Sequence, residues 1–428
     1  MAKTYDTYKD SGIAWIGEIP GEWEVSKMKY IGTYINGYAF KPTDWQNSGK
    51  PIIRIQDLTG SISNSNYYNG DLEEKYLVKK GDILVSWAAT LDAFIWEKEE
   101  EGWLNQHIFK ALPNISVINK HYFFWLVKVA MSEMNNDNKH GIVMQHVTLG
   151  VFNLFKIPLP PLSEQEDIAT CLDEKCGEID SLISIQEEMI SELLAYKQSV
   201  ITEAVTKGLD KKAKMKNSGV EWIGDIPEEW EVIKIQYLNQ GLTDGTHGTY
   251  NRVDKGRLLL SSKNVREKDL LITDSESQIS EEDYQSIISN GFPKKGDLLM
   301  CCIGASIGRC IIYKYDETYA FQRSVIFIRC NKLIKPELLR YNLLSNNSLL
   351  QELFLINQSA QAGLYQGQVK EIKVIVPPIS KQKQIIDYLD EKTSQINSLI
   401  ALKQSKIESL KEYKKSIIYE YVTGKKRV

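Results

Sequence analysis

The sequence lacks the features of a secreted, metal-binding or membrane-spanning protein. Its six cysteines form no Cys-x-x-Cys pair, and the five histidines lie apart from them. Neither a zinc site nor a disulfide framework is therefore indicated. The longest apolar stretch, near 122–131, contains Lys128 and is too short to cross a bilayer, and no basic, apolar leader is visible. We expect a reduced, cytoplasmic protein that binds neither a metal nor a membrane.

Motifs of the common enzyme classes are missing as well. There is no phosphate-binding G-x-x-x-x-G-K-[ST] loop, no H-E-x-x-H, no G-x-S-x-G and no Asn/Asp-Pro-Pro-aromatic motif of an amino-methyltransferase. Residues 304–308 (GASIG) favour a tight turn over a nucleotide site, because no Lys-Ser/Thr follows. We expect no catalytic residue and no cofactor on this chain. The net charge of −4 argues against bulk binding of a polyanion, but local basic patches are compatible with it.

What the chain has is repetition. Residues 11–25 (SGIAWIGEIPGEWEV) return as 218–232 with 11 of 15 positions identical, and residues 160–183 return as 377–400 with 13 of 24 identical. The regions between them, roughly 26–157 and 233–374, match poorly. We infer two halves that share their repeated motifs and differ in the regions between these motifs. For the paired tryptophans of the first motif, an aromatic strap that closes each domain is favoured over a docking site for a partner.

Two long helices are the clearest elements. Each begins after a Pro-Pro pair, runs for about 40 residues and ends near Gly208 or Gly424. Apolar residues recur at heptad spacing, which is typical of a coiled coil, and the duplication favours antiparallel pairing within the chain. The alternative is that each helix packs on its own domain. The residues predicted to form the contact are Leu172, Ile179, Ile183, Ile190, Leu193, Leu389, Ile396, Ile400, Ile407 and Leu410.

The regions between the repeats predict an α+β fold with a mixed or antiparallel sheet. Strand-like runs at 52–55, 257–262 and 324–330 and Gly-Asp turns near 81 and 296 alternate with helical stretches at 120–134 and 336–354. We divide the chain into a first globular domain (1–159), a first long helix (160–208), a linker with a second globular domain (209–376) and a second long helix (377–428).

Polar side chains suited to reading DNA occur at four matched places in the two halves. Amide, Lys and Arg side chains pair with base edges, and glycines permit close approach. The candidates in the first half are Asn36, Lys41, Arg54, Gln56, Ser86, Thr90, Asn105, Gln106 and His107. Those in the second half are Thr243, Asp244, Thr246, His247, Lys263, Asn264, Ser306, Arg309, Gln322 and Arg323. Each residue alone is more simply a polar turn; the set at matched places favours binding. Weaker candidates are the polar loops at 139–140, 145–146 and 358–361.

With these motifs together, the chain resembles the specificity subunit of type I restriction–modification systems. The resemblance rests on the duplicated W-I-G-x-I-P-x-x-W, the P-P-[LI]-S-x-Q start of each long helix, the following L-D-E-K and I-x-S-L-I runs, and the divergent region between each pair. It spans 11–424. The D-G-T-H of residues 244–247 and the matched Gln106 and Gln322 also look like elements of a target recognition domain, although the segment 36–45 lacks the D-G-T-H pattern.

This resemblance implies a non-catalytic, DNA-binding subunit. Each divergent region would be a target recognition domain that reads one half of a bipartite, asymmetric sequence in double-stranded DNA, and the helices would fix the spacer between the half-sites. The subunit would dock two DNA adenine-methyltransferase subunits, which bring S-adenosylmethionine, and two translocase–endonuclease subunits, which bring ATP and Mg²⁺.

Two other classes stay open from the residues alone. Acidic net charge and 10% aromatic content also suit an adaptor that binds proteins through two domains on a coiled-coil spacer. An enzyme with an unrecognised site is the third class.

Overall fold

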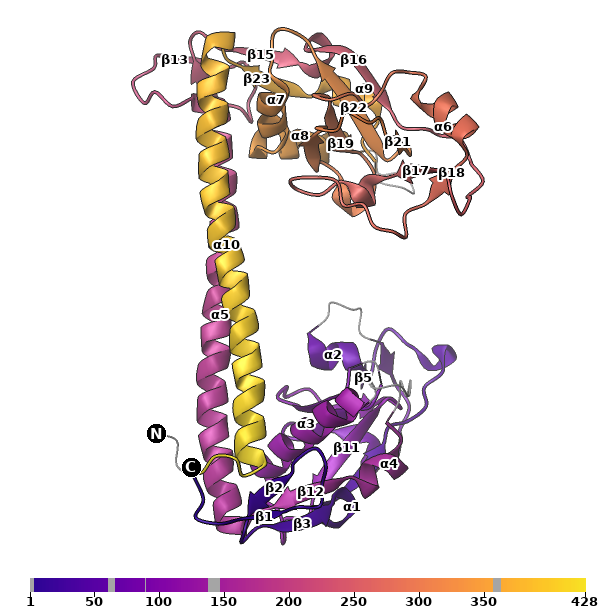
Figure 1. The fold of residues 1–428 in the computed structure, drawn as a ribbon, viewed down its shortest axis with the longest axis vertical. Helices are drawn as coiled ribbons and strands as arrows, with labels where there is room; N and C mark the ends of the chain where they lie inside the picture. The colour runs from indigo at the N-terminus through magenta and orange to yellow at the C-terminus, as the bar shows by residue number, and fades with distance from the viewer. Residues whose placement is uncertain (1–3, 61–65, 89, 138–146, 357–362) are drawn as a thin grey trace. The chain divides into compact units, whose positions relative to one another are not determined.

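The computed structural model describes residues 4–60, 66–88, 90–137, 147–356 and 363–428. The chain forms two compact units: unit 1 comprises 1–186 and 405–428, and unit 2 comprises 187–404 (Figure 1). Each unit therefore contains one globular domain and part of both long helices. Among the described residues, none of the helices combines the length and apolarity needed to cross a bilayer. The weaker candidates at 139–140, 145–146 and 358–361 lie outside the described residues.

Unit 1 is built from short strands and helices that precede the first long helix. Its strands are β1 (Tyr8–Asp10), β2 (Glu18–Pro20), β3 (Glu24–Lys27), β4 (Gly32–Asn36), β5 (Lys50–Ile53), β6 (Tyr67–Tyr68), β7 (Leu77–Val78), β8 (Ile83–Ser86), β9 (Asp92–Ile95), β10 (Gly102–Leu104), β11 (Ile108–Pro113) and β12 (Lys156–Leu159). Its helices are α1 (Met28–Ile31), α2 (Ile55–Thr59), α3 (Lys120–Asp137) and α4 (Leu149–Leu154).

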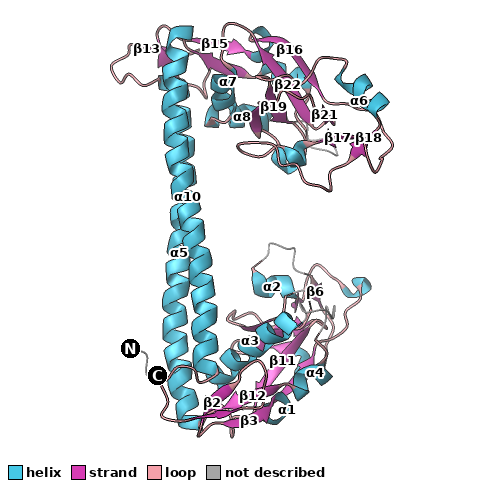
Figure 2. Ribbon diagram, in the orientation of Figure 1, coloured by secondary structure: helices cyan, strands magenta, loops and turns pink. Residues whose placement is uncertain are grey.

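Unit 2 repeats this plan with its own insertions. Its strands are β13 (Met215–Asn217), β14 (Asp225–Pro227), β15 (Glu231–Lys234), β16 (Asn239–Asp244), β17 (Arg257–Leu260), β18 (Gln278–Ile279), β19 (Leu298–Cys301), β20 (Cys310–Ile312), β21 (Ala320–Phe321), β22 (Val325–Cys330) and β23 (Lys373–Val376). Its helices are α6 (Glu281–Ile288), α7 (Pro336–Leu343), α8 (Asn346–Leu355) and α9 (Gln366–Glu371) (Figure 2).

The two units share the topology of their antiparallel sheet over the described residues, but the smaller sheet has four strands in unit 1 and three in unit 2. An antiparallel sheet runs β4-β11-β8-β9 in unit 1 and β16-β22-β19-β20 in unit 2. Beside it lies a smaller mixed sheet, in which β5 pairs in parallel with β10 and β17 pairs in parallel with β21. The predicted α+β class with mixed or antiparallel sheets is confirmed.

The predicted bounds of several elements differ from the structure, among them the strand 257–262, which ends at Leu260 before a short 3₁₀ helix at Ser262–Asn264. The predicted helix 336–354 is two helices, α7 and α8, separated by Leu344 and Ser345. The predicted strand 52–55 ends at Ile53, because Arg54 begins the short helix α2.

The long helices are α5 (Leu162–Lys207) and α10 (Ile379–Val422), and they pack together in each unit. In unit 2, Lys197 Nζ donates to Asn397 Oδ1 at 2.8 Å, and Lys403 Nζ lies 3.3 Å from Met189 Sδ. As the residue number falls along α5 it rises along α10, so the helices are antiparallel, as predicted.

All ten residues predicted for the helix contact are shielded from solvent. Seven are buried: Leu172, Ile179, Leu389, Ile396, Ile400, Ile407 and Leu410. The other three are half-buried: Ile183, Ile190 and Leu193. Gly208 and Gly424 follow the helix ends with φ of 75° and 72°, the left-handed conformation that glycine adopts at low cost after a helix.

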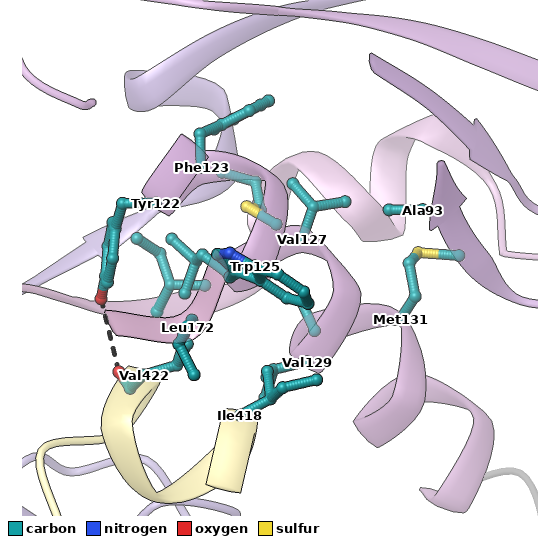
Figure 3. Close-up of a cluster of buried hydrophobic side chains, with 14 of the residues drawn as sticks. Ala93, Tyr122, Phe123, Trp125, Val127, Val129, Met131, Leu172, Ile418 and Val422 are labelled. Carbon is teal, nitrogen blue, oxygen red and sulfur yellow. Dashed lines mark hydrogen bonds between the residues drawn. The ribbon is translucent and has the colours of Figure 1, made fainter. Parts of the chain in front are cut away.

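The core of unit 1 joins its globular domain to the helices (Figure 3). Tyr122 and Trp125 of α3 are buried in the same cluster as Leu172 of α5 and Ile418 of α10. The Tyr122 hydroxyl donates to the Val422 carbonyl at 3.3 Å. Packing of this kind stabilises a long amphipathic helix far more than helix propensity does.

A buried glutamine fixes each long helix to its globular domain at the Pro-Pro motif. Gln165 is 1% exposed and Gln382 is fully buried. Gln165 Nε2 donates to the Pro160 and Val117 carbonyls, and its Oε1 accepts from the Asn119 N–H. Gln382 makes the matching set with Pro377, Leu333 and Lys335. The Gln of P-P-[LI]-S-x-Q is therefore a structural connector.

The tryptophans of the first repeat act mainly as the predicted strap. Trp23 is buried, and its Nε1 donates to Glu164 of α5 at 2.9 Å. Trp15 stacks on Phe155 with ring centroids 5.5 Å apart. In unit 2, Trp230 is buried against Gly208, whereas Trp222 is 47% exposed.

Candidate nucleic-acid interface

In unit 1 the four predicted places meet at one end of the antiparallel sheet. The backbone bonds that join them are Gly37 N–H to Ile108 O (3.1 Å), Tyr38 N–H to Leu104 O (2.8 Å), Asn105 N–H to Ile53 O (3.2 Å) and Trp87 N–H to His107 O (3.4 Å). Segments that are far apart in the sequence thus form one continuous edge. We call this the reading edge of unit 1, made of 36–38, 53–56, 86–88 and 104–108.

Unit 2 forms the same edge from its own four places. The bonds are Gly245 N–H to Val325 O (2.9 Å), Thr246 N–H to Phe321 O (2.8 Å), Gln322 N–H to Leu260 O (2.8 Å) and Cys302 N–H to Ser324 O (3.0 Å). The reading edge of unit 2 consists of 244–247, 260–264, 301–306 and 321–325. The sequence match between the halves therefore identified segments that come together in both units.

The hydrogen bonds correct one sequence equivalence. Asn105 N–H donates to Ile53 O as Gln322 N–H donates to Leu260 O, so Gln322 corresponds to Asn105. The apparent match of Gln106 with Gln322 is wrong by one residue, because alignment by residue type cannot see the register of the strands. Gln106 instead takes the place of Arg323.

A glycine is required at the same point of each edge. A Cβ added to Gly37 would lie 2.1 Å from the Asn105 carbonyl oxygen, and one added to Gly245 would lie 2.3 Å from the Gln322 oxygen. Real Cβ atoms do not approach backbone this closely. Asn36-Gly37 and Asp244-Gly245 therefore share a backbone role, although the sequence 36–45 lacks the D-G-T-H pattern.

The D-G-T-H segment forms its own hydrogen-bonded group in unit 2. Asp244 accepts from Gln366 Nε2 at 2.6 Å and lies 2.7 Å from Nε2 of His247. Thr246 Oγ1 and the Tyr250 hydroxyl are 2.6 Å apart. A cavity of about 230 Å³ adjoins this group and is also lined by Phe292, Phe321 and Phe327. Gln366 is a functional candidate that carried no signal in the sequence.

Two predicted residues face the interior. Ser86 is fully buried, and its hydroxyl donates to the Ala88 carbonyl at 3.2 Å. Asn264 is 1% exposed; its Oδ1 accepts from the Ser261 N–H and its Nδ2 donates to the Leu271 carbonyl, both at 2.9 Å. Their polar groups are used in holding the edge together, so in this structure neither side chain is presented to a ligand.

The other predicted residues reach the surface to different degrees. Asn36, Lys41, Thr90, His107, His247, Lys263 and Arg323 are exposed, and Arg54, Gln56, Asn105, Gln106, Thr243, Asp244, Thr246, Ser306, Arg309 and Gln322 are half-buried. Lys263 lies 2.8 Å from Glu276 Oε2, and this hydrogen bond lowers the pKa of Glu276. Arg309 donates to the Val265 carbonyl at 3.0 Å. Arg266 and Lys268 are exposed on the same loop and were missed, because a short charged run in a loop has no distinctive pattern.

Two buried thiols lie at the edge of unit 2. Burial raises the pKa of Cys301 to about 11 and that of Cys302 to about 12, so both are neutral thiols at pH 7. All six cysteines are free. Across the described residues, His, Cys, Asp and Glu side chains form no group able to hold a metal ion.

Comparisons with known proteins agree with one another. The type I restriction modification DNA specificity domain matches residues 20–194 and 224–412. The chain is 27% identical to the type I restriction enzyme EcoBI specificity subunit of Escherichia coli, over 90% of this chain and 83% of that protein. It is also 27% identical to the MjaVIII specificity subunit of Methanocaldococcus jannaschii, over 96% of this chain and 94% of that protein.

The fold is shared with a solved structure. A chain from a study of complex assembly and conformational transition of the type I R-M system superposes with a TM-score of 0.67, covering 94% of this chain and 98% of that one at 14% identity.

Proposed function

Since the chain belongs to the type I restriction–modification specificity family and is the non-catalytic subunit that recognises the DNA target, we propose that each reading edge contacts one half of a bipartite, asymmetric site. The observation that carries this proposal is the repeated backbone ladder with unlike side chains. Two equal frames with different exposed groups suit two half-sites of different sequence.

We assign recognition of the base sequence to side chains of the reading edges that enter the major groove of DNA. On the proposed edges, amides such as Asn105 and Gln322 suit adenine, and Arg323 suits guanine. Each good bidentate contact discriminates by about 1–3 kcal/mol. Exposed cations such as Lys41 would contact phosphates and set the register on the duplex.

Because the chain has a net charge of −4, we assign part of the affinity for DNA to partner subunits. We assign methylation to two adenine-methyltransferase subunits that carry S-adenosylmethionine, and cleavage to two translocase–endonuclease subunits that carry ATP and Mg²⁺. A gel shift on duplex DNA containing the methylated motif tests this assignment. We expect weak binding by the chain alone and tight, sequence-dependent binding with the methyltransferase. Equal, sequence-independent binding in both cases would contradict it.

The helices are proposed to set the spacer between half-sites. At about 1.5 Å per residue, α5 with 46 residues is about 69 Å long, longer than one DNA turn of roughly 34 Å. Inserting a four-residue block into one helix should lengthen the preferred spacer in methylome sequencing. The matched control places the same block in the linker at 209–214, where we expect no change. An unaltered spacer in the helix variant would defeat this role.

A further inference from the structure

A lysine interrupts the apolar contact between the long helices at the same place in each unit. Lys197 of α5 and Lys414 of α10 occupy equivalent positions, 217 residues apart. Their side chains are only 15% and 21% exposed. A cation that is shielded in this way requires an anionic or strongly polar partner. The two units supply that partner from different places.

In unit 1 the helices neutralise their own lysine. Lys414 Nζ lies 2.6 Å from both carboxylate oxygens of Asp180 on α5. The nearby carboxylate of the globular domain, Asp92, is bound by Lys128 of α3 at 2.8 Å. These four residues line one groove between α3 and the long helices. Asp180 and Asp92 are therefore each paired with a lysine, one within the long helices and one within the globular domain.

In unit 2 the helix carboxylate is replaced by an amide. The position of Asp180 is taken by Asn397, which accepts a hydrogen bond from Lys197 at 2.8 Å but brings no negative charge. The charge comes from Glu267 of the globular domain, whose carboxylate forms an ion pair with Lys197. Lys197, Glu267 and Asn397 line the corresponding groove of unit 2.

Glu267 lies on a loop that begins within the second reading edge and carries exposed cations. Residues 262–270 include Lys263 and Arg266, both exposed. The loop is also held by Arg340, which lines the same groove and donates to the Glu267 carbonyl at 3.0 Å. Burial would raise the pKa of Glu267, but the hydrogen bond and charge of Lys197 keep this pKa below its ordinary value. The carboxylate is therefore ionised and paired at neutral pH.

We propose that Lys197 is a positioning residue that holds the loop 262–270 of unit 2 on the long helices through Glu267. Among the described residues of unit 1, Lys414 makes no such link to its globular domain. The proposal rests on the proposed function, because its consequence is read in DNA recognition. Loss of the link lets the loop shift relative to its half-site without removing any group that faces DNA.

The test uses two substitutions in the complex with the methyltransferase. E267Q removes the charge from the loop, and N397D supplies a carboxylate from the helix that competes for Lys197. For each we compare kcat/KM for methylation of the cognate site with that of sites carrying single base changes in either half. We expect both variants to lose about fivefold in discrimination, at one half-site only and at the same half-site, with thermal stability close to that of the natural chain.

Two further variants complete the test. D180N in unit 1 is the matched control, and we expect it to alter thermal stability without changing discrimination at either half-site. The exchange K197E/E267K restores the ion pair in reverse and should recover discrimination that E267K alone loses. Natural discrimination in both E267Q and N397D, or an equal loss at both half-sites, would overturn the proposal. A natural complex without any sequence preference would instead refute the proposed function.

Discussion

The two reading edges have equivalent backbone hydrogen bonds, but the residues at equivalent positions carry different side chains. At equivalent places, unit 1 presents Asn105 and Gln106 where unit 2 presents Gln322 and Arg323. The ladder itself uses main-chain groups and one glycine, so the exposed side chains at the edge can change without loss of the fold, whereas the buried Ser86 and Asn264 help to hold it together. The comparison teaches that frame and specificity are separable in this molecule.

The largest expected effect breaks the shared frame itself. We expect G37V and G245V each to destabilise the protein by more than about 4 kcal/mol, because the new side chain overlaps a carbonyl oxygen. Thermal unfolding measures the change. The control is G177A in the middle of α5, where an added Cβ meets nothing within 4 Å; it should stabilise by about 0.5–1 kcal/mol. Tolerance of valine at either edge would show that the ladder is not required.

A second prediction concerns a buried carboxyl group of unit 2. Glu352 of α8 is 2% exposed, its Oε1 has no hydrogen-bond partner among the described residues, and burial raises its pKa to about 8. Because the folded pKa is above the unfolded value, the folded state holds the proton more tightly. The contribution of Glu352 to stability is therefore fully present below its unfolded pKa of about 4.5 and is lost as the pH rises through 8.

Substitution by an uncharged isostere isolates this effect. We expect E352Q to match the natural chain near pH 5 and to exceed it at pH 8 by on the order of 3 kcal/mol, measured by denaturant unfolding. E371Q is the control, since Glu371 is a half-exposed partner of Lys234 and should show little of this pH dependence. A natural chain with the same stability at both pH values would contradict the assignment.

A smaller effect is expected where the units are alike. Q165A and Q382A should each destabilise by about 2 kcal/mol, because each leaves buried carbonyl and N–H groups without a partner. Similar losses at both sites would confirm that the Pro-Pro motif has one structural role. A change below about 0.5 kcal/mol at one site would show that this unit is held in another way.

Two features could be predicted from the sequence, one from the period of its apolar residues and one from its internal repeat. Heptad spacing identified the residues between α5 and α10, and the duplication located the four segments of each edge. It could not show that Gln322 corresponds to Asn105, because strand register depends on pairing rather than on residue type. Nor could it separate exposed Lys263 from buried Asn264, since adjacent polar residues in a loop differ only in which way the backbone turns them.

The partners of the two lysines in the contact between the long helices could not be predicted from the sequence either. In the sequence, Lys197 and Lys414 each occupy one position of a heptad row that is otherwise mostly apolar. Only the fold shows that Lys414 forms an ion pair with Asp180 and that Lys197 forms one with Glu267. Glu267 is 70 residues from Lys197 in the sequence.

The most direct test of two separable readers on a common frame is to make them alike. Residues 26–157 are replaced by a copy of 233–374, the chain is expressed with its methyltransferase, and the modified adenines are mapped by methylome sequencing. The account predicts a palindromic motif built from one half-site. Retention of the original asymmetric motif would contradict it.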